Sequence, residues 1–364
     1  MNVVVVGAGV IGYAVAYELA ARGAHVRVVD PRGHGGGATR ASAGILAPYI
    51  EGHSAALLEL GVASLNQYES FLARVTADAG RDVEYRRTGT LQIALDENEA
   101  RELERQASQL ARQRVDHSLV SKTELARIEP AATSDARAGL LVARHGYVGV
   151  SSLMAALVAA AGRQGVTPLA MKVEAVQAAG GEVHLSTSDG NLTCDAAIIA
   201  AGSWSGGIST RPAPPAPVRP VRGQLVQLRS SPGALEHVVW GAACYLVPWE
   251  DGTVLVGATV EEVGFDERVT EEGVRQLRAS GERVAPVLGS AAFVDARAGL
   301  RPATVDELPI VGPSSTMPGV FYATGHYRNG VLLAPWTGSA IADLVLAGRR
   351  SSELDLARPD RFGL

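Results

Sequence analysis

The chain has 364 residues, of which 47% are hydrophobic and 20% are charged, and it carries a formal net charge of −5. This length suggests two domains, or one domain with a large insertion, and it allows a sizeable core without disulfides. Without a basic excess, we expect no binding to nucleic acid or to anionic membrane surfaces. Two cysteines, Cys194 and Cys244, are too few for a disulfide framework or a four-ligand zinc site. These features favour a cytoplasmic protein that binds no metal.

The apolar N-terminus does not have the pattern of a membrane span. Residues 3–17 contain three glycines, follow no Lys or Arg, and end before Glu18. A span needs about 20 consecutive apolar residues, so this stretch is too short. We expect no other segment to come closer, and the sequence therefore predicts a soluble protein.

The first thirty residues predict a complete β-α-β unit. Residues 3–6 are four valines, as expected for a strand that is buried on both faces of a parallel sheet. A glycine-rich turn, a helix over residues 10–22 and a strand over residues 25–29 follow. Gly23 stops the helix, and Asp30 closes the second strand.

Helices and strands then alternate up to a proline-rich segment. Residues 33–48 are rich in Gly, Ala, Ser and Thr and form a loop or a tight helix start. Helices are predicted over residues 54–79, 96–114 and 151–162, and strands over residues 85–95, 171–176 and 196–201. Asp189 and Gly190 predict a hairpin turn. Residues 211–220 contain too many prolines for a helix or a central strand, and they mark a crossing between domains.

The second half of the chain predicts an antiparallel sheet. Its strands are expected over residues 223–228, 244–248, 253–258 and 293–300, with a helix over residues 271–287. A buried strand over residues 320–323 and a last helix over residues 331–346, ending near Gly348, then complete the chain.

A dinucleotide fingerprint lies in the first unit. Gly7, Gly9 and Gly12 have the GxGxxG spacing between a strand and a helix, and Asp30 follows the next strand. The first glycine permits the turn, the second lets a pyrophosphate approach the backbone, and the third lets the helix and the strand pack closely. The helix N-terminus holds the phosphate charge, and the acid accepts hydrogen bonds from ribose hydroxyls.

The fingerprint does not by itself separate NAD from FAD. An NAD dehydrogenase would continue β-α-β units in close succession. Here residues 35–44 are a run of small residues, followed by long helices and an interrupted sheet. Such a run suits a loop laid against a bulky ring and its phosphates, and a merely flexible loop explains this segment alone equally well.

Several further segments carry a family resemblance. They are residues 43–44, 201–205, 244–248, 256–259, 298–302 and 324–335. With the fingerprint, they make the chain resemble the D-amino-acid oxidase family of FAD flavoproteins over nearly its whole length. The second half looks most similar to the glycine oxidases linked to thiamine biosynthesis.

The resemblance implies an α/β fold with two domains. A Rossmann-like FAD-binding domain is expected from the discontinuous segments 1–50, 140–215 and 305–364. A substrate-binding domain, whose antiparallel sheet roofs the flavin, is expected from residues 51–139 and 216–304.

The fingerprint and the resemblance together predict the FAD contacts. Val173 would meet the adenine through its backbone, and residues 326–332 would run beside the isoalloxazine. Neither cysteine lies where a covalent flavin link is expected, so FAD should be bound non-covalently. The predicted contacts are Gly7, Gly9, Val10, Ile11, Gly12, Asp30, Pro31, Ala38, Thr39, Ala43, Gly44, Ile45, Val173, Gly202, His326, Tyr327, Arg328, Asn329, Gly330, Val331 and Leu332.

Three side chains are predicted to act on the substrate. Because flavin accepts the hydride, the protein mainly has to orient the amine. The resemblance makes Arg301 the clamp for the substrate carboxylate, a role that suits a guanidinium. It places Tyr245 within reach of the same carboxylate and Arg328 near both substrate and flavin. Without the resemblance, these residues are equally well explained as a surface arginine, a buried strand tyrosine and an ion-paired structural arginine.

Two other features of the resemblance concern the flavin. His326 is expected to be a flavin contact rather than a base, because hydride transfer from a neutral amine needs none. The N-terminus of the last helix, aimed at the pyrimidine edge of the flavin, would stabilise the negative charge of the reduced ring.

The chain departs from the glycine oxidases beside Tyr245. Ala243, preceded by Ala242, stands where these enzymes often carry a histidine, and Trp249 stands in place of a common arginine. A smaller pocket wall should leave room for an N-substituted glycine. The expected products are glyoxylate, ammonia or a free amine, and H2O2 from O2.

Several alternatives remain open at this stage. Within the family they are a sarcosine oxidase or dehydrogenase and a D-amino-acid oxidase acting on another small amino acid. A nicotinamide dehydrogenase, a tRNA-modifying flavoprotein and a non-catalytic flavin module are more distant possibilities. The resemblance also suggests a homo-oligomer.

Overall fold

A parallel sheet forms one side of the molecule in the computed structural model, which describes residues 1–51, 54–230 and 233–364. Its strand order is β19-β20-β13-β1-β2-β9. All neighbouring pairs are parallel except β19–β20. The central valines of β1 pair with strands on both sides and are buried, as predicted. The strands are β1 (Asn2–Val6), β2 (His25–Val29), β9 (Thr167–Leu169), β13 (Ala196–Ile199), β19 (Ile310–Pro313) and β20 (Val320–Thr324).

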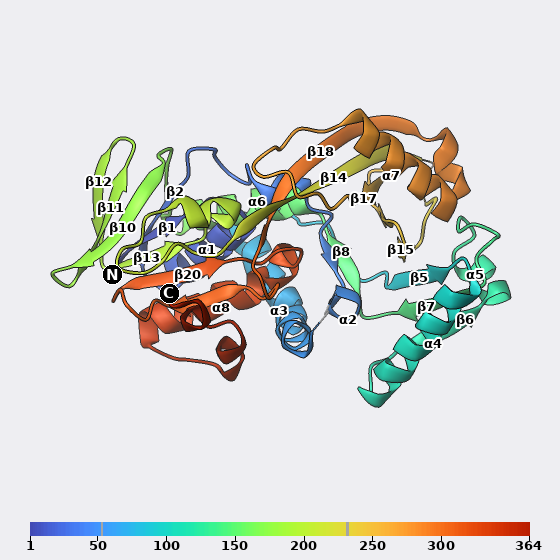
Figure 1. Cartoon of the computed structure of the whole chain (residues 1–364), viewed down its shortest axis with the longest axis horizontal. Coiled ribbons are helices and arrows are strands. Elements are labelled where there is room, and N and C mark those ends of the chain that lie inside the picture. Colours follow the sequence, from blue (N-terminus) through green and yellow to red (C-terminus); the bar gives the residue numbers. More distant parts are fainter. Residues whose placement is uncertain (52–53, 231–232) are drawn as a thin grey trace.

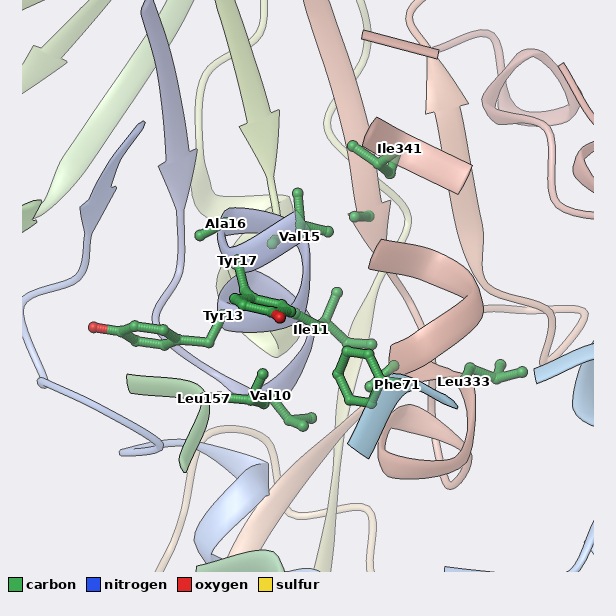
Figure 2. Close-up of a cluster of buried hydrophobic side chains, with 14 of the residues drawn as sticks. Val10, Ile11, Tyr13, Val15, Ala16, Tyr17, Phe71, Leu157, Leu333 and Ile341 are labelled. Carbon is green, nitrogen blue, oxygen red and sulfur yellow. The ribbon is translucent and has the colours of Figure 1, made fainter. Parts of the chain in front are cut away.

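Helices cover this sheet in one continuous core. They are α1 (Val10–Ala21), α3 (Ala55–Ala79), α6 (Val150–Arg163) and α8 (Gly330–Ala347). Figure 2 shows side chains of these helices gathered around α1, where Tyr17 meets Phe71 edge to face at 6.5 Å. α3 packs against α1 and α8 in this core. The predicted assignment of residues 51–79, with the rest of 51–139, to the substrate-binding domain stays a prediction.

The prediction that no other segment comes closer to the length and composition of a membrane span is wrong, because α8 does. Among the described residues, this helix is long and apolar enough to cross a membrane. Most of it is buried inside the protein, against α1 and α3, because it is the central helix of the core. Its uniform hydrophobicity follows from being surrounded on every side.

A second, largely antiparallel sheet of eight strands forms the other side of the molecule. Its order is β18-β14-β17-β16-β15-β5-β7-β6, and only β15 and β5 run parallel. In Figure 1 the long strands β14 and β18 connect this sheet with the parallel sheet. The strands are β5 (Thr90–Ala94), β6 (Ser118–Ser121), β7 (Ala138–Val142), β14 (Arg219–Arg229), β15 (Val238–Trp240), β16 (Tyr245–Pro248), β17 (Thr253–Gly257) and β18 (Ala292–Ala303).

Two small sheets complete the strands. One contains β10 (Val173–Ala179), β11 (Glu182–Thr187) and β12 (Gly190–Cys194), and the other contains β3 (Ile45–Leu46), β8 (Gly146–Val148) and β4 (Tyr85–Arg86). The predicted turn at Asp189 and Gly190 is confirmed one residue earlier, because Thr187 pairs with Gly190.

The remaining helices are short or lie at the surface. The α-helices are α2 (Pro48–Glu51), α4 (Glu97–Arg112), α5 (Lys122–Ile128) and α7 (Glu271–Val284). The 3-10 helices are η1 (Ala38–Ala41), η2 (Gly202–Gly207), η3 (Pro286–Ser290), η4 (Ser352–Leu356) and η5 (Pro359–Phe362).

The α/β fold class is confirmed, and most predicted elements are present with slightly shifted ends. The predicted strand over residues 85–95 is wrong as one piece, because Gly89 has a φ of +82° and separates β4 from β5. The predicted strand over residues 171–176 begins and ends later, as β10. The proline-rich segment leads from η2 into β14, that is, from one large sheet to the other.

Candidate active site

A cavity of about 360 Å³ lies between the two large sheets. One wall, here called the cofactor wall, comes from the ends of β1 and β2, residues 37–45 and the segment before α8. The opposite wall, here called the substrate wall, comes from β15 to β18 of the eight-stranded sheet. The three predicted catalytic residues, Tyr245, Arg301 and Arg328, all line this cavity.

Glycines give the cofactor wall its close backbone approaches. Gly7 has a φ of +115°, and a Cβ at this position would collide with the carbonyl oxygen of Ala200. A Cβ on Gly12 would collide with the carbonyl oxygen of Gly7, and one on Gly44 with that of Val148. These positions therefore accept only glycine without local rearrangement.

The N-termini of α1 and α8 face the cavity, and their own N-cap residues supply no side-chain cap. Gly9 before α1 and Asn329 before α8 make no side-chain capping bond, and neither helix has an acidic residue in its first turn. At the surface, by contrast, Asp96 caps α4 and Thr270 caps α7. The first N–H groups of a helix lack partners within it and carry a partial positive charge. The cofactor wall thus offers two anion-binding ends in one cavity, which fits a pyrophosphate and a flavin ring.

Asp30 organises the turn next to α1. Its Oδ2 accepts a hydrogen bond from the N–H of Ala8 at 2.9 Å, and its Oδ1 accepts one from the N–H of Arg32 at 2.7 Å. Thr39 accepts a bond from the N–H of Val10 at 3.1 Å, which joins the 3-10 helix η1 to the start of α1. The carboxylate lies at the end of β2, where the fingerprint predicts a ribose partner.

Most of the predicted FAD contacts line the cavity, and four do not. Gly12 lies beneath the turn, Pro31 is exposed, and Val173 is buried with the β10 sheet. Leu332 packs into the core below the α8 terminus, where its carbonyl accepts a bond from Ser64 at 2.7 Å. The others lie at the cavity surface: Gly7, Gly9, Val10, Ile11, Asp30, Ala38, Thr39, Ala43, Gly44, Ile45, Gly202, His326, Tyr327, Arg328, Asn329, Gly330 and Val331.

The substrate wall places its two anchoring side chains over glycines. Tyr245 on β16 pairs directly with Gly257 on β17, and a Cβ on that glycine would collide with the tyrosine ring. Arg301 on β18 lies across Gly223 on β14, where a Cβ would collide with the guanidinium. Both side chains therefore lie flat on neighbouring strands because these strands have no side chain there.

Burial of Tyr245 favours a protonated phenol. Burial raises the pKa of Tyr245 to about 12, although the neighbouring Arg301 and Arg328 charges oppose the shift. The Nη1 of Arg301 donates to the carbonyl of Thr259 at 3.0 Å, which holds the guanidinium in place. The wall thus presents a neutral hydroxyl donor beside a fixed cation, an arrangement suited to a carboxylate.

Arg328 lies in a more constrained setting. It follows Tyr327, whose φ of +47° is unusual for a bulky residue, and the N–H of Tyr327 donates to the carbonyl of Pro302 at 2.9 Å. Burial alone would lower the pKa of Arg328, but hydrogen bonding to Tyr327 and the charge of Glu51 raise it. Arg328 therefore stays charged, beside an acid that also lines the cavity.

His326 is buried and neutral. Its Nε2 is hydrogen-bonded to Thr337 Oγ1 at 3.0 Å. Burial lowers the pKa of His326 to about 3, so the ring carries no charge near neutral pH. This agrees with a structural contact in the cofactor wall rather than a base.

The cavity also contains residues that the sequence pattern does not indicate. Trp240, Glu51 and Arg32 line it without belonging to any recognised motif, whereas Trp204 lies inside the quoted segment 201–205. Ala242 and Ala243 line the cavity beside Tyr245, as expected. Trp249 does not line the cavity, and the Arg297 guanidinium lies 5.7 Å from the centre of its ring.

The described part of the chain contains no group of three or more His, Cys, Asp or Glu side chains that could hold a metal ion.

Known proteins are similar to this chain in sequence and in fold. The family profile "FAD dependent oxidoreductase" (DAO) matches residues 2–344. Glycine oxidase from Geobacillus kaustophilus (strain HTA426) is 32% identical, over 98% of this chain and 95% of its own. The crystal structure of glycine oxidase from Geobacillus kaustophilus superposes with a TM-score of 0.91 at 31% identity, covering 98% of this chain and 96% of that one. Iminodiacetate oxidase from Chelativorans sp. BNC1 superposes with a TM-score of 0.88 at 26% identity and covers 98% of both chains.

Proposed function

The chain belongs to the FAD dependent oxidoreductase (DAO) family, and on this premise we propose that it oxidises glycine or an N-substituted glycine in the cavity between its two large sheets. It is a glycine oxidase-like, FAD-dependent amine oxidoreductase. The proposal adds the substrate, the products and the roles of individual residues.

The arrangement of Arg301 and Tyr245 carries this proposal. Both residues project from glycine-backed positions into a cavity whose other wall has the N-termini of α1 and α8. Arg301 and the Tyr245 hydroxyl bind the substrate carboxylate, and this contact directs the α-carbon toward the cofactor wall. One such charge-assisted contact contributes about 1.5–3 kcal/mol.

The chemistry then follows from the bound groups. FAD, when bound, supplies the two-electron oxidation of the C–N bond and transfers the electrons to O2. The imine product reacts with water to give glyoxylate and the amine, or ammonia when glycine is the substrate. In total, R–NH–CH2–COO⁻, O2 and H2O give R–NH2, glyoxylate and H2O2.

The chain's own groups position the reactants without moving a proton. Tyr245 remains a hydrogen-bond donor because its pKa lies near 12, and His326 remains neutral because its pKa lies near 3. Arg328 adds a second positive charge at the cavity, next to Glu51. The substrate amine therefore has to arrive in its neutral form, having lost its ammonium proton to solvent.

The open side of the substrate wall favours a substituent on the nitrogen. Ala242 and Ala243 are exposed, small and adjacent to the Trp240 ring, which lies 5.2 Å from the Tyr245 ring. An apolar or aromatic N-substituent would pack there without displacing a polar group. The similarity to a structure described as an iminodiacetate oxidase supports a secondary amine as substrate.

FAD is held without a covalent bond in this proposal. Cys244 lines the cavity, but burial raises the pKa of its thiol to about 12, and so no thiolate is present to attack the flavin. Cys194 lies in the core of the β10 sheet, away from the cavity. Yellow colour should appear in the supernatant after acid precipitation, and colour retained in the pellet would contradict this point.

In the proposed roles, Gly7 and Gly9 approach the FAD phosphates, Asp30 binds the ribose, and Gly12 lets α1 pack closely against β1. Both cysteines are free and buried, which supports a reducing, cytoplasmic location. The expected partners are a small amine and O2.

The direct test is an anaerobic titration of the flavin band. Glycine, sarcosine, D-alanine and N-benzylglycine are each added to the purified protein, and bleaching is followed at equal concentrations. The proposal predicts bleaching by glycine or by an N-substituted glycine, with glyoxylate as product. Bleaching by D-alanine alone, or by none of the four, would overturn it.

A matched variant defines the substituent pocket. Ala243→Leu fills the exposed side of the substrate wall and leaves Arg301 and Tyr245 in place. It should slow reduction by N-benzylglycine about tenfold more than reduction by glycine. Equal effects on both substrates would show that the substituent binds elsewhere.

A further inference from the structure

A loop of the eight-stranded sheet crosses over the cofactor end of the cavity. Residues 258–270, here called the strap, connect β17 to α7. The strap begins at the cavity, where Ala258 and Val260 belong to the lining. Its middle is exposed and contains Val263 and Phe265, which are 41% and 58% accessible.

The base of the strap is fixed to the sheet. Arg222 on β14 is 4% exposed, and its guanidinium pairs with Glu261 at 2.5 Å and with Asp266 at 3.1 Å. Burial would raise the pKa of Glu261, but the bonds from Arg222, Gln224 and Thr259 lower it overall, so the carboxylate is charged. Because a buried cation holds both carboxylates, the strap is a defined structure despite having no helix or strand.

The tip of the strap contacts the cofactor segments. Glu267 accepts two hydrogen bonds from Arg32 Nη2, at 2.8 and 3.0 Å, and Phe265 lies 5.9 Å from the Trp204 ring. The Arg32 guanidinium in turn lies over the Trp204 ring, 4.3 Å from its centre. These four residues, here called the clasp, form one series of contacts from the Glu267 carboxylate through Arg32 and Trp204 to the Phe265 ring.

The clasp lies at the cofactor end of the cavity. Arg32 and Trp204 belong to the lining, and the N–H of Arg32 donates to Asp30 at 2.7 Å. Trp204 also lies against Gly37, where a Cβ would be 3.3 Å from the indole. Hydrogen bonds anchor the residues on either side of Trp204: Ser203 donates to the carbonyl of Leu300, and Ser205 is bonded to Thr324.

We propose that the clasp of Arg32, Trp204, Phe265 and Glu267 closes the FAD site and sets the rate at which FAD leaves it. The residues on the two sides of the clasp come from different sheets, so the clasp has to open for the cofactor to pass between them. The Arg32–Glu267 pair is about one-third exposed, with side-chain accessibilities of 31% and 24%. Such a pair is weak enough to break and salt-sensitive.

The test measures FAD release in the absence of substrate. The holoenzyme is diluted, and the fluorescence of released FAD is followed with time. Phe265→Ala and Glu267→Gln should each speed release about threefold, and the double variant about tenfold. High salt should speed release from the parent more than from Glu267→Gln, because only the parent has the ion pair to screen.

Glu262→Gln is the matched control. Glu262 lies on the same strap and pairs with Arg219 at the surface, away from the clasp. Its release rate should equal that of the parent. The proposal is overturned if the double variant releases FAD at the parent rate, or if Glu262→Gln releases it as fast as the double variant.

Two further measurements separate an effect on FAD release from a folding defect and from a wrong substrate proposal. Thermal unfolding of the apoproteins should give equal Tm values for parent and variants, since the strap lies outside the core. Unequal values, tracking the release rates, would assign the effect to folding and contradict the clasp. The proposed substrate is tested separately by flavin bleaching, so either idea can fail without the other.

Discussion

The cofactor wall and the substrate wall of the cavity both present positive charge, but they are built in different ways. The cofactor wall uses backbone: glycines at close approaches and the N-termini of α1 and α8. The substrate wall uses side chains, Arg301 and Tyr245, laid over glycines on neighbouring strands. A backbone wall tolerates few changes of sequence, whereas a side-chain wall can change its substrate by a few substitutions. The difference explains how one cofactor scaffold can serve several amines.

The largest effect is expected in the cofactor wall. Gly7→Ala adds a Cβ that collides with the Ala200 carbonyl at a φ of +115°, and neither backbone can move without disturbing β1 or β13. The purified variant should lack flavin absorbance. Gly162→Ala, at a helical position with nothing within 4 Å of the new Cβ, is the control and should retain FAD. Normal flavin content in Gly7→Ala would show that the close approach is not needed.

A smaller and more selective effect is expected at Gly223. Its Cβ would collide with the end of the Arg301 side chain, which is flexible and can move away. Gly223→Ala should therefore keep its FAD and its Tm but reduce the efficiency of flavin reduction by about 10- to 100-fold. Stopped-flow reduction rates and flavin content, measured on the same sample, separate the two effects. Unchanged reduction would mean that the position of Arg301 is not critical.

Tyr245→Phe should have a moderate effect. The change removes one hydrogen bond to the carboxylate and leaves the ring in place, so substrate affinity should fall about tenfold. Because burial raises the Tyr245 pKa to about 12, the parent hydroxyl stays protonated, and KM should show no phenol ionisation between neutral pH and pH about 10. Such an ionisation, present in the parent and absent from Tyr245→Phe, would contradict the environment described.

A separate effect concerns the stability of the fold against pH rather than the chemistry of either wall. Burial lowers the pKa of His326 to about 3 from an ordinary value of 6.5, so between these values the unfolded chain binds a proton that the folded chain does not. The free energy of unfolding should therefore fall as pH drops below 6.5, by up to about 1.4 kcal/mol per pH unit for this group. His145, whose burial also lowers its pKa to about 3, adds to the slope.

Urea unfolding at several pH values measures this slope. His326→Asn should reduce it by the share of one histidine, and His184→Asn, at an exposed position on β11, should leave it unchanged. A slope in His326→Asn equal to that of the parent would show that the buried ring titrates normally.

The same contrast explains what the sequence could predict. The β-α-β unit, Asp30 and the glycine turn are local, so their spacing alone indicates a dinucleotide site. Arg301 and Tyr245 have no such local signal, and they were predicted because their segments resemble a known family. Trp240 and Glu51 reach the cavity only through tertiary pairing, as when β15 joins β5 in parallel.

Other differences have similar physical causes. The short strands β6 and β7 lie in a stretch without clear periodicity, and they join the sheet only because β7 pairs with β5 and β6 pairs with β7. The α8 helix has the composition of a membrane span because it is enclosed by the core. The contacts of the strap with Arg32 and Trp204 join positions far apart in the chain, so no spacing rule could indicate them.

The division of labour between the two walls is tested most directly by binding a carboxylate that cannot react. Glycolate resembles glycine with a hydroxyl in place of the amine, and its binding can be followed as a shift of the flavin spectrum in the parent and in Arg301→Leu. We predict a saturable shift in the parent and about 10- to 150-fold weaker binding in the variant, with equal FAD content in both. Equal affinities for glycolate, or loss of FAD from Arg301→Leu, would contradict the assignment of cofactor and substrate to separate walls.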